Sequence, residues 1–272
     1  MKLQAVIFDW AGTLVDHGSR GPVAALQDVF AAAGVPISVA EARLSMGIAK
    51  RDHIAAILAL PRVAKALDAD IDALYADFIP KQIECLGRYS GLIAGVSATA
   101  EGLRSRGIRI GSTTGYTRAM LDFLVERARE QGFTPDCAIS PQDVPGGGRP
   151  APWMCYLNAI RLEASPLWAM VKIGDTPSDI EEGLNAGMWT IGITRTGNEV
   201  GLTEDEWNST SLPEQGRLIE RAGKRLLDAG AHYVAESVAD CLDTIDEIAG
   251  RLSYCTPNAS NTFPRMPPPR SA

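Results

Sequence analysis

Short apolar runs alternate with longer amphipathic stretches over much of the chain. Runs without internal polar alternation are typical of parallel strands covered on both faces. Five such runs are predicted to be strands: Leu3–Phe8, Ile108–Ser112, Cys137–Ser140, Ala169–Gly174 and Thr190–Ile193. Helices are expected between them at Val96–Arg106, Arg118–Gln131, Trp153–Leu162 and Ser178–Ala186. The alternation predicts an α/β fold with a doubly wound, mainly parallel sheet as its core.

One region, residues 21–95, interrupts this alternation. It is rich in Ala and Leu, has no convincing strand, and predicts helices at Pro22–Ala33, Val39–Leu60 and Ile71–Arg88. We expect an inserted all-helical cap over residues 21–95, on a core domain of residues 1–20 and 96–255. Glycine-containing segments at both ends of the insert could act as hinges. The stretch 256–272 contains five prolines and few large apolar residues, which predicts a disordered tail.

The overall charge and the cysteines indicate which partners and which cellular compartment to expect. The formal net charge of -7 argues against nucleic acid or an anionic membrane as the main partner, because both attract basic surfaces. The five cysteines are scattered and form no CxxC pair, which favours reduced thiols. The first apolar run is too short for a signal peptide, and no run approaches the roughly 18 residues of a membrane span. These features predict a cytoplasmic enzyme.

Polar residues follow the predicted strands in a suggestive order. Asp9 follows the first strand, and Thr13, just beyond it, offers a hydroxyl and an N–H to an oxyanion. Thr114, Gly115 and their neighbours follow the second strand and open a helix, which suits a phosphate. Arg149 lies beside a glycine run and can offer paired N–H donors. Taken singly, each signal is equally explained by a helix cap or an exposed loop.

Two further aspartates, Asp175 and Asp179, follow the fourth strand and open a helix. Asp175 and Asp9 together could supply the oxygen ligands that Mg²⁺ prefers, with Asp179 supporting them. Either aspartate alone could instead be a helix N-cap. The four signals occur in order, each behind a buried strand. In that order they resemble the haloacid dehalogenase superfamily, whose nucleophilic aspartate becomes phosphorylated.

Ala11 departs from the phosphatases of that superfamily, which carry there a second aspartate that acts as general acid and base. The loss of such assistance is often worth about 10²- to 10⁴-fold in rate. In the predicted cap, the spacing of Met46, Lys50 and His53 places them on one helical face. A lysine desolvated under a cap becomes a nucleophilic amine and condenses with an aldehyde. The resulting imine would accept electrons from a breaking C–P bond, which removes the need for an acid at position 11.

Whole segments of the chain resemble the phosphonoacetaldehyde hydrolase (phosphonatase) family of this superfamily. They are residues 7–13, 46–54, 111–117, 149–154 and 174–179, and the resemblance covers nearly the whole chain except the tail. It implies C–P bond hydrolysis of phosphonoacetaldehyde to acetaldehyde and phosphate. It also implies a homodimer joined through the caps.

The resemblance also implies roles for individual residues. Asp9 would attack phosphorus, and Lys50 would form the Schiff base. Mg²⁺ would bind Asp9, the backbone carbonyl of Ala11 and Asp175, with Asp179 orienting the metal side of the site. The residues expected to bind the substrate or its phosphonate group are Thr13, Met46, Gly47, Thr114, Gly115, Tyr116 and Arg149. His53 would lie near the imine and move a proton through water.

One position departs from the family pattern, and two neighbours have no assigned role. Some members carry a cysteine near the substrate where this chain has Ser19, to which we assign no catalytic role. His17 and Arg20 are interpreted as loop residues. The rival functions are a phosphomonoesterase or phosphosugar mutase of the same superfamily, and a non-catalytic phosphate-binding protein. Ala11 counts against the first pair, and a nucleophile that mere binding would not need counts against the second.

Overall fold

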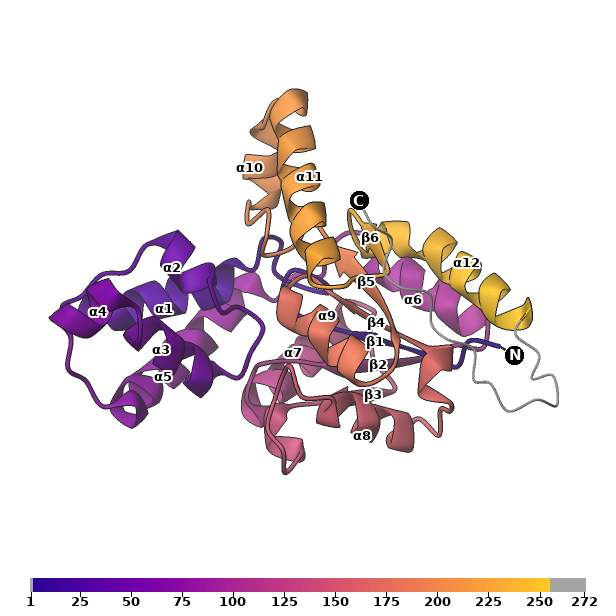
Figure 1. The fold of residues 1–272 in the computed structure, drawn as a ribbon, viewed down its shortest axis with the longest axis horizontal. Helices are drawn as coiled ribbons and strands as arrows, with labels where there is room; N and C mark the ends of the chain where they lie inside the picture. The colour runs from indigo at the N-terminus through magenta and orange to yellow at the C-terminus, as the bar shows by residue number, and fades with distance from the viewer. Residues whose placement is uncertain (1, 255–272) are drawn as a thin grey trace.

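The computed structural model describes residues 2–254, which form a parallel sheet between two layers of helices, with further helices to one side (Figure 1). The sheet order is β3-β2-β1-β4-β5-β6. The strands are β1 (Ala5–Phe8), β2 (Arg109–Thr113), β3 (Cys137–Ile139), β4 (Met170–Gly174), β5 (Trp189–Ile193) and β6 (Tyr233–Ala235). Every neighbouring pair is parallel. Among the described residues, no helix has the length and apolar character needed to cross a membrane.

The two faces of the sheet bury different helices. Side chains of β1 alternate, so that Val6 and Phe8 join one core cluster while Ala5 and Ile7 join another. The first face is covered by α6 (Val96–Ser105), α7 (Arg118–Glu130) and α12 (Cys241–Tyr254). The second face is covered by α8 (Trp153–Arg161), α9 (Pro177–Asn185) and α11 (Leu212–Asp228). The predicted doubly wound α/β core is therefore confirmed.

The sequence prediction missed the helices and the strand in the last part of the core. The five predicted strands and four predicted core helices are present, with ends shifted by one or a few residues. Between Thr194 and Tyr254 the structure adds β6, α11, α12 and the short α10 (Glu204–Ser209). It also contains three 3₁₀ turns, at Pro141–Asp143, Leu167–Ala169 and Val238–Asp240. The tail predicted for residues 256–272 lies outside the described residues.

An all-helical cap is inserted between β1 and α6, as predicted. Its helices are α1 (Arg20–Ala32), α2 (Val39–Arg43), α3 (Lys50–Leu58), α4 (Pro61–Ala66) and α5 (Ile71–Tyr89). Figure 1 shows them as a group beside the sheet, with α1 packed along α5. The domain boundaries at 20/21 and 95/96 stay a prediction, although α1 begins at Arg20, next to the first of them.

The single helix predicted for Val39–Leu60 is wrong. The chain leaves the helix after Arg43 and starts a new one at Lys50, because Gly47 has a left-handed φ of 94° that no helix accepts. Met46 therefore lies in the connection between α2 and α3. Positions 46, 50 and 53 do not share one helical face, although Lys50 and His53 lie one turn apart on α3.

The sheet order explains why the polar residues gather. β1 lies between β2 and β4, and all three strands run in the same direction. The residues that follow these strands, including Asp9, Thr114 and Asp175, therefore meet at one edge of the sheet. The segment between α2 and α3 of the cap reaches this edge, and cap and core residues line one cavity there.

Candidate active site

Three buried aspartates form the acidic part of the site. Oxygen atoms of Asp9, Asp175 and Asp179 all lie within 4.8 Å of one another. Asp9 directly follows β1, and its backbone N–H donates to Ile173 O at 2.8 Å, which extends the sheet by one residue. Asp179 lies in the first turn of α9, where Thr176 Oγ1 donates to its Oδ2 at 2.6 Å. The predicted aspartates therefore come together, and Asp179 is also part of a helix capping box.

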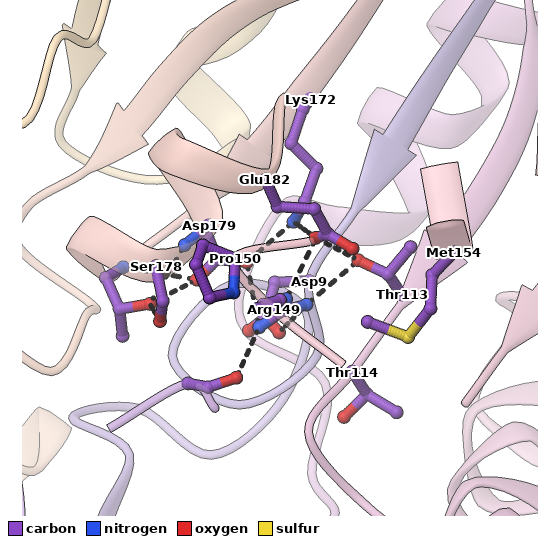
Figure 2. A network of polar contacts seen from close by, with 12 residues as sticks. Asp9, Thr113, Thr114, Arg149, Pro150, Met154, Lys172, Ser178, Asp179 and Glu182 are labelled. Atoms are coloured by element: carbon purple, nitrogen blue, oxygen red, sulfur yellow. Dashed lines mark hydrogen bonds and ion pairs between the residues drawn. The ribbon is translucent and has the colours of Figure 1, made fainter. Parts of the chain in front are cut away.

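Arg149 lies at the centre of a buried polar network (Figure 2). Its side chain is 1% exposed, which excludes the exposed-loop interpretation. Arg149 Nη2 is 2.8 Å from Asp9 Oδ1, and Nη1 is 2.9 Å from Asp179 Oδ1. Arg149 Nε donates to Glu182 Oε2 at 2.9 Å. The guanidinium thus holds Asp9 and Asp179 side by side, in the planar geometry that suits paired oxygen acceptors.

Two members of this network, Lys172 and Glu182, were missed as site residues. Lys172 Nζ is 2.6 Å from Asp179 Oδ1, and Glu182 Oε2 also accepts from Thr113 Oγ1 at 2.9 Å. Both side chains are fully buried. A signal was present in the sequence, because Lys172 interrupts an apolar strand and Glu182 lies three residues after Asp179 on one helix face. A buried charge without a partner is costly, so each implied an opposite charge nearby.

The fixed charges of the site do not balance. Asp9, Asp175, Asp179 and Glu182 supply four carboxylates, whereas Arg149, Lys172 and the protonated form of Lys50 supply three cations, which leaves one negative charge. Burial, followed by the neighbouring carboxylates, raises the pKa of Asp9 and of Asp175. A divalent cation would neutralise this excess, and the oxygen-only donor set suits a hard ion. The residues present therefore fit a divalent metal, and Ala11 lines the same cavity.

Lys50 enters the site from the first turn of α3. It is only 5% exposed, and its Nζ lies 5.0 Å from the ring centroid of Tyr116. No carboxylate of residues 2–254 forms an ion pair with it. Burial therefore lowers the pKa of Lys50 to about 8, against the opposing charge of Asp9. Roughly a tenth to a fifth of this amine is therefore neutral near physiological pH, far more than of an exposed lysine.

His53 is close to Lys50 in sequence but does not line the cavity. Its Nε2 lies 2.9 Å from the carbonyl oxygen of Ala42, so Nε2 carries the proton and Nδ1 keeps a lone pair. That Nδ1 is buried and has no partner among the described residues. Burial, and then the charge of Lys50, lowers the pKa of His53 to about 3, which keeps the ring neutral.

Two predicted glycines are required by the close approach of cap and core. A Cβ on Gly115 would lie 2.4 Å from the carbonyl oxygen of Ile48 in the cap. A Cβ on Gly47 would lie 2.4 Å from Thr176 Oγ1, and the φ of Gly47 is left-handed.

The cavity between these segments is lined by the following predicted residues: Asp9, Ala11, Met46, Gly47, Lys50, Thr114, Gly115, Tyr116, Arg149 and Asp175. Thr13 is buried beside the site but does not line the cavity, and its hydroxyl has no partner among residues 2–254.

Ser19 contacts the site more directly than we expected. Its Oγ donates to Asp175 Oδ2 at 2.9 Å, and the residue lines the cavity with a left-handed φ of 50°. The interpretation of His17 as a loop residue fits the structure, whereas that of Arg20 is wrong, because Arg20 is the first residue of α1. His17 Nδ1 lies 2.9 Å from Leu202 O, and Arg20 pairs with Glu206 at 3.2 Å.

Comparisons with known proteins agree with this geometry. A family model described as haloacid dehalogenase-like hydrolase matches residues 3–187. The phosphonoacetaldehyde hydrolase of Nitratidesulfovibrio vulgaris is 44% identical over 260 residues, covering 92% of each chain. The phosphonoacetaldehyde hydrolase of Bacillus cereus is 43% identical over 257 residues, covering 91% of this chain and 97% of that protein. A phosphonoacetaldehyde hydrolase-like protein from Oleispira antarctica has a crystal structure that superposes with a TM-score of 0.91 at 38% identity, covering 94% of this chain and 96% of that one.

The fold, the aspartate after β1 and the family match define a haloacid dehalogenase-like hydrolase. The resemblance found in the sequence is thereby confirmed. Its relatives at 42% to 44% identity carry one enzyme name over nearly their whole length. The chain therefore belongs to the phosphonoacetaldehyde hydrolase family.

Proposed function

We propose that this enzyme hydrolyses the C–P bond of phosphonoacetaldehyde to acetaldehyde and phosphate, through a Schiff base on Lys50 and an aspartyl-phosphate on Asp9. One observation carries the proposal. Lys50 from the cap and Asp9 from the core line the same buried cavity. The names of the relatives support the substrate, and Ala11 in place of an acid supports a leaving group activated by an imine.

The first step uses the depressed pKa of Lys50. The neutral amine adds to the aldehyde carbon, and with one proton taken from solvent the hydroxyl leaves as water, which produces a protonated imine; the final hydrolysis returns this proton. The amine is available because burial lowers its pKa to about 8. The ring of Tyr116, 5.0 Å from Nζ, offers its face to the positive charge that the imine keeps.

In the second step a carboxylate oxygen of Asp9 attacks phosphorus. The C–P bond breaks, and its electron pair moves into the imine to give a neutral enamine on Lys50. Arg149 Nη2, 2.8 Å from Asp9, is placed to donate to the phosphoryl oxygens as they approach the nucleophile. Thr114 and Gly115 line the same wall of the cavity and would complete this cradle.

The last steps return both residues to their starting states. Water attacks the aspartyl-phosphate and releases phosphate, while the enamine takes a proton on carbon. A second water hydrolyses the resulting imine to acetaldehyde, so the net reaction consumes one water. We propose that His53 assists this proton transfer by orienting a water, because its unpartnered Nδ1 can accept a hydrogen bond while the ring stays neutral.

We propose Mg²⁺ as the cofactor, held by Asp9, Asp175 and the backbone carbonyl of Ala11, with Asp179 in support. The excess of carboxylates over cations in the site and the oxygen donors support this choice. When bound, the ion supplies charge neutralisation between the nucleophile and the phosphonate oxygens. Without it, Asp9, Asp175 and a dianionic substrate would repel one another.

We expect the purified protein to release acetaldehyde from phosphonoacetaldehyde with Mg²⁺ present. A coupled alcohol dehydrogenase follows the product, and EDTA should reduce the rate by at least about 10²-fold because it leaves the carboxylates unneutralised. Added Mg²⁺ should restore the rate after EDTA, which excludes irreversible damage. A panel of phosphate monoesters serves as the comparison. Faster turnover of any ester than of the phosphonate would favour the rival phosphomonoesterase.

We also propose a homodimer joined through the cap, as the family resemblance implies. The cap exposes the apolar side chains of Val39, Leu44 and Ile83, which are 42%, 55% and 44% exposed. Light scattering should give about twice the chain mass of 29.1 kDa. A monomeric mass at working concentration would refute the dimer. Leu44→Glu should shift the mass toward that of the monomer, whereas the control Leu212→Glu, on the core, should leave the dimer intact.

The cellular setting stays a proposal. Cys85, Cys137, Cys155 and Cys241 are buried and unpaired, which suits a reducing compartment. We therefore propose a cytoplasmic enzyme that acts on a small phosphonate, without a nucleic acid or membrane partner. Cell fractionation with an activity assay checks the location.

A further inference from the structure

Arg43, the last residue of α2, connects the cap directly to the core. Its Nη1 donates to the carbonyl oxygen of Asn198 at 3.1 Å and to Asn198 Oδ1 at 2.7 Å. Its Nη2 donates to the carbonyl oxygens of Gly18 at 2.9 Å and Gly201 at 3.1 Å. All four acceptors belong to residues outside the cap helices. One side chain of the cap thus makes four hydrogen bonds across the boundary.

The contacts of Arg43 depend on the shape of a guanidinium. Arg43 forms no ion pair within residues 2–254, so its N–H groups donate to these neutral oxygen acceptors, while the carboxylates of Asp175, Asp16 and Glu199 act on its charge from farther away. A planar fork can satisfy two pairs of oxygens at once, which an ammonium on a single stem cannot do. The space for this fork is provided by Gly201, where a Cβ would lie 2.8 Å from Arg43 Cζ.

The loop that receives Arg43 also holds Asp175. The backbone N–H of Asn198 donates to Asp175 Oδ2 at 2.7 Å. A Cβ on the preceding Gly197 would lie 2.7 Å from Asp175 Cβ, so the loop packs directly against this aspartate. Thr196 Oγ1 donates to Gly12 O at 2.8 Å, which ties the loop to the turn that follows Asp9. Asn198 therefore contacts Arg43 on one side and Asp175 on the other.

The cap segment that starts at Arg43 leads to Lys50. Along this segment, the carbonyl oxygen of Met46 accepts from Ser178 Oγ at 3.0 Å. The carbonyl oxygen of Gly47 accepts from Arg149 Nη1 at 3.3 Å. These two contacts lie beside the cavity, and Arg43 fixes the other end of the same short segment. The position of Lys50 in the cavity it shares with Asp9 thus depends on contacts at both ends.

We infer that Arg43 is a positioning residue that couples closure of the cap to the placement of Asp175. It acts through Asn198 on the metal side of the site and through residues 44–49 on Lys50. Opening of the cap would break its four hydrogen bonds and release the loop 196–202 from one side. The inference rests on the proposed function only for its kinetic consequences. Its structural consequences can be measured without substrate.

The test is Arg43→Ala, compared with Arg62→Ala as a matched control. Arg62 is an exposed cap arginine whose guanidinium, among the described residues, donates only to the Glu41 carboxylate and to the carbonyl oxygen of Pro36, both within the cap. Arg43→Ala should raise the KM for phosphonoacetaldehyde by about 10- to 100-fold, because several hydrogen bonds of a charged donor are lost. The Mg²⁺ dissociation constant, measured calorimetrically without substrate, should rise about 3- to 10-fold. Added guanidinium should lower the raised KM of Arg43→Ala part of the way toward the wild-type value. The kcat of this variant should change less than its KM.

A substrate-independent measurement separates this inference from the proposed function. Hydrogen exchange of residues 196–202 should quicken in Arg43→Ala and stay at the wild-type rate in Arg62→Ala. If the wild type released no acetaldehyde, the proposed function would fail while the exchange and Mg²⁺ results still decided the role of Arg43. Equal Mg²⁺ affinity, KM and exchange in the two variants would overturn the inference. Should Arg43→Ala not fold, Arg43→Lys and Asn198→Ala replace it, because each removes part of the same contact.

Discussion

Replacing Asp9 with Asn is expected to reduce the release of acetaldehyde and phosphate by at least about 10⁴-fold. The amide has nearly the shape of the carboxylate but is not a nucleophile toward phosphorus. Asp9 is 5% exposed and its carboxylate lies 2.8 Å from Arg149, the group expected to bind the phosphoryl oxygens, so the nucleophile and the phosphate-binding cation are held together. Phosphate and acetaldehyde should be measured together in single-turnover experiments, which detect even one reaction per active site.

The same variant tests whether the two covalent steps are separable. Lys50 belongs to another segment, so Asp9→Asn should still form the imine, and borohydride should still trap it. Asp122→Asn, which removes an exposed carboxylate on α7, is the control and should keep full activity. Phosphate release above trace levels by Asp9→Asn would refute the covalent role of Asp9. If Asp9→Asn lost both turnover and borohydride trapping of the imine, the substitution would instead have damaged the site as a whole.

The part of the site that follows the sheet could be predicted because it depends on local patterns. An uninterrupted apolar run marks a buried strand, and the ends of parallel strands meet at one edge of the sheet. Asp9, Thr114 and Asp175 each follow such a run, so their convergence followed from the sequence. Arg149 lies on a loop, and its place near them came from the resemblance. The structure then showed that it holds Asp9 and Asp179 together.

The parts that could not be predicted depend on contacts between distant segments. The helix predicted for Val39–Leu60 contains one glycine, Gly47, which a helix can tolerate, and only the structure shows that Gly47 adopts a left-handed φ and packs against Thr176. β6 has three residues, none fully buried, and so lacks the apolar signature of the other strands. The contacts of Arg43 with Asn198, and of Asn198 with Asp175, join segments more than 20 residues apart. Nothing local in the sequence marks them.

Lys50 and Lys172 show why burial alone does not identify a nucleophile. Burial would lower the pKa of both amines. The carboxylates of Asp179 and Glu182 outweigh this effect at Lys172 and raise its pKa, so that amine stays protonated. Lys50 has no such ion pair within residues 2–254, and its pKa falls to about 8. Of these two lysines, only Lys50 is suited to attack an aldehyde.

Lys50→Arg is therefore expected to lose at least about 10³-fold in acetaldehyde formation, although the positive charge is kept. A guanidinium stays protonated at every accessible pH and does not form the imine. With borohydride and substrate, the wild type should lose activity and gain the mass of a reduced adduct on the peptide that contains Lys50. Lys65→Arg, at an exposed position on α4, is the control and should behave like the wild type.

The pH dependence supplies a separate check on the same amine. Because Lys50 must be neutral to react, kcat/KM should increase as pH rises through about 8 and level off above it. A flat profile from pH 6 to 9, or an adduct mapped to Lys172, would contradict the assignment. The second result would require Lys172 to leave its ion pair with Asp179, whose atoms are 2.6 Å apart. Asp179 would then keep Arg149 but lose Lys172 as a partner. Because Asp179 supports the proposed metal site, the Mg²⁺ requirement should change in any protein that carries such an adduct.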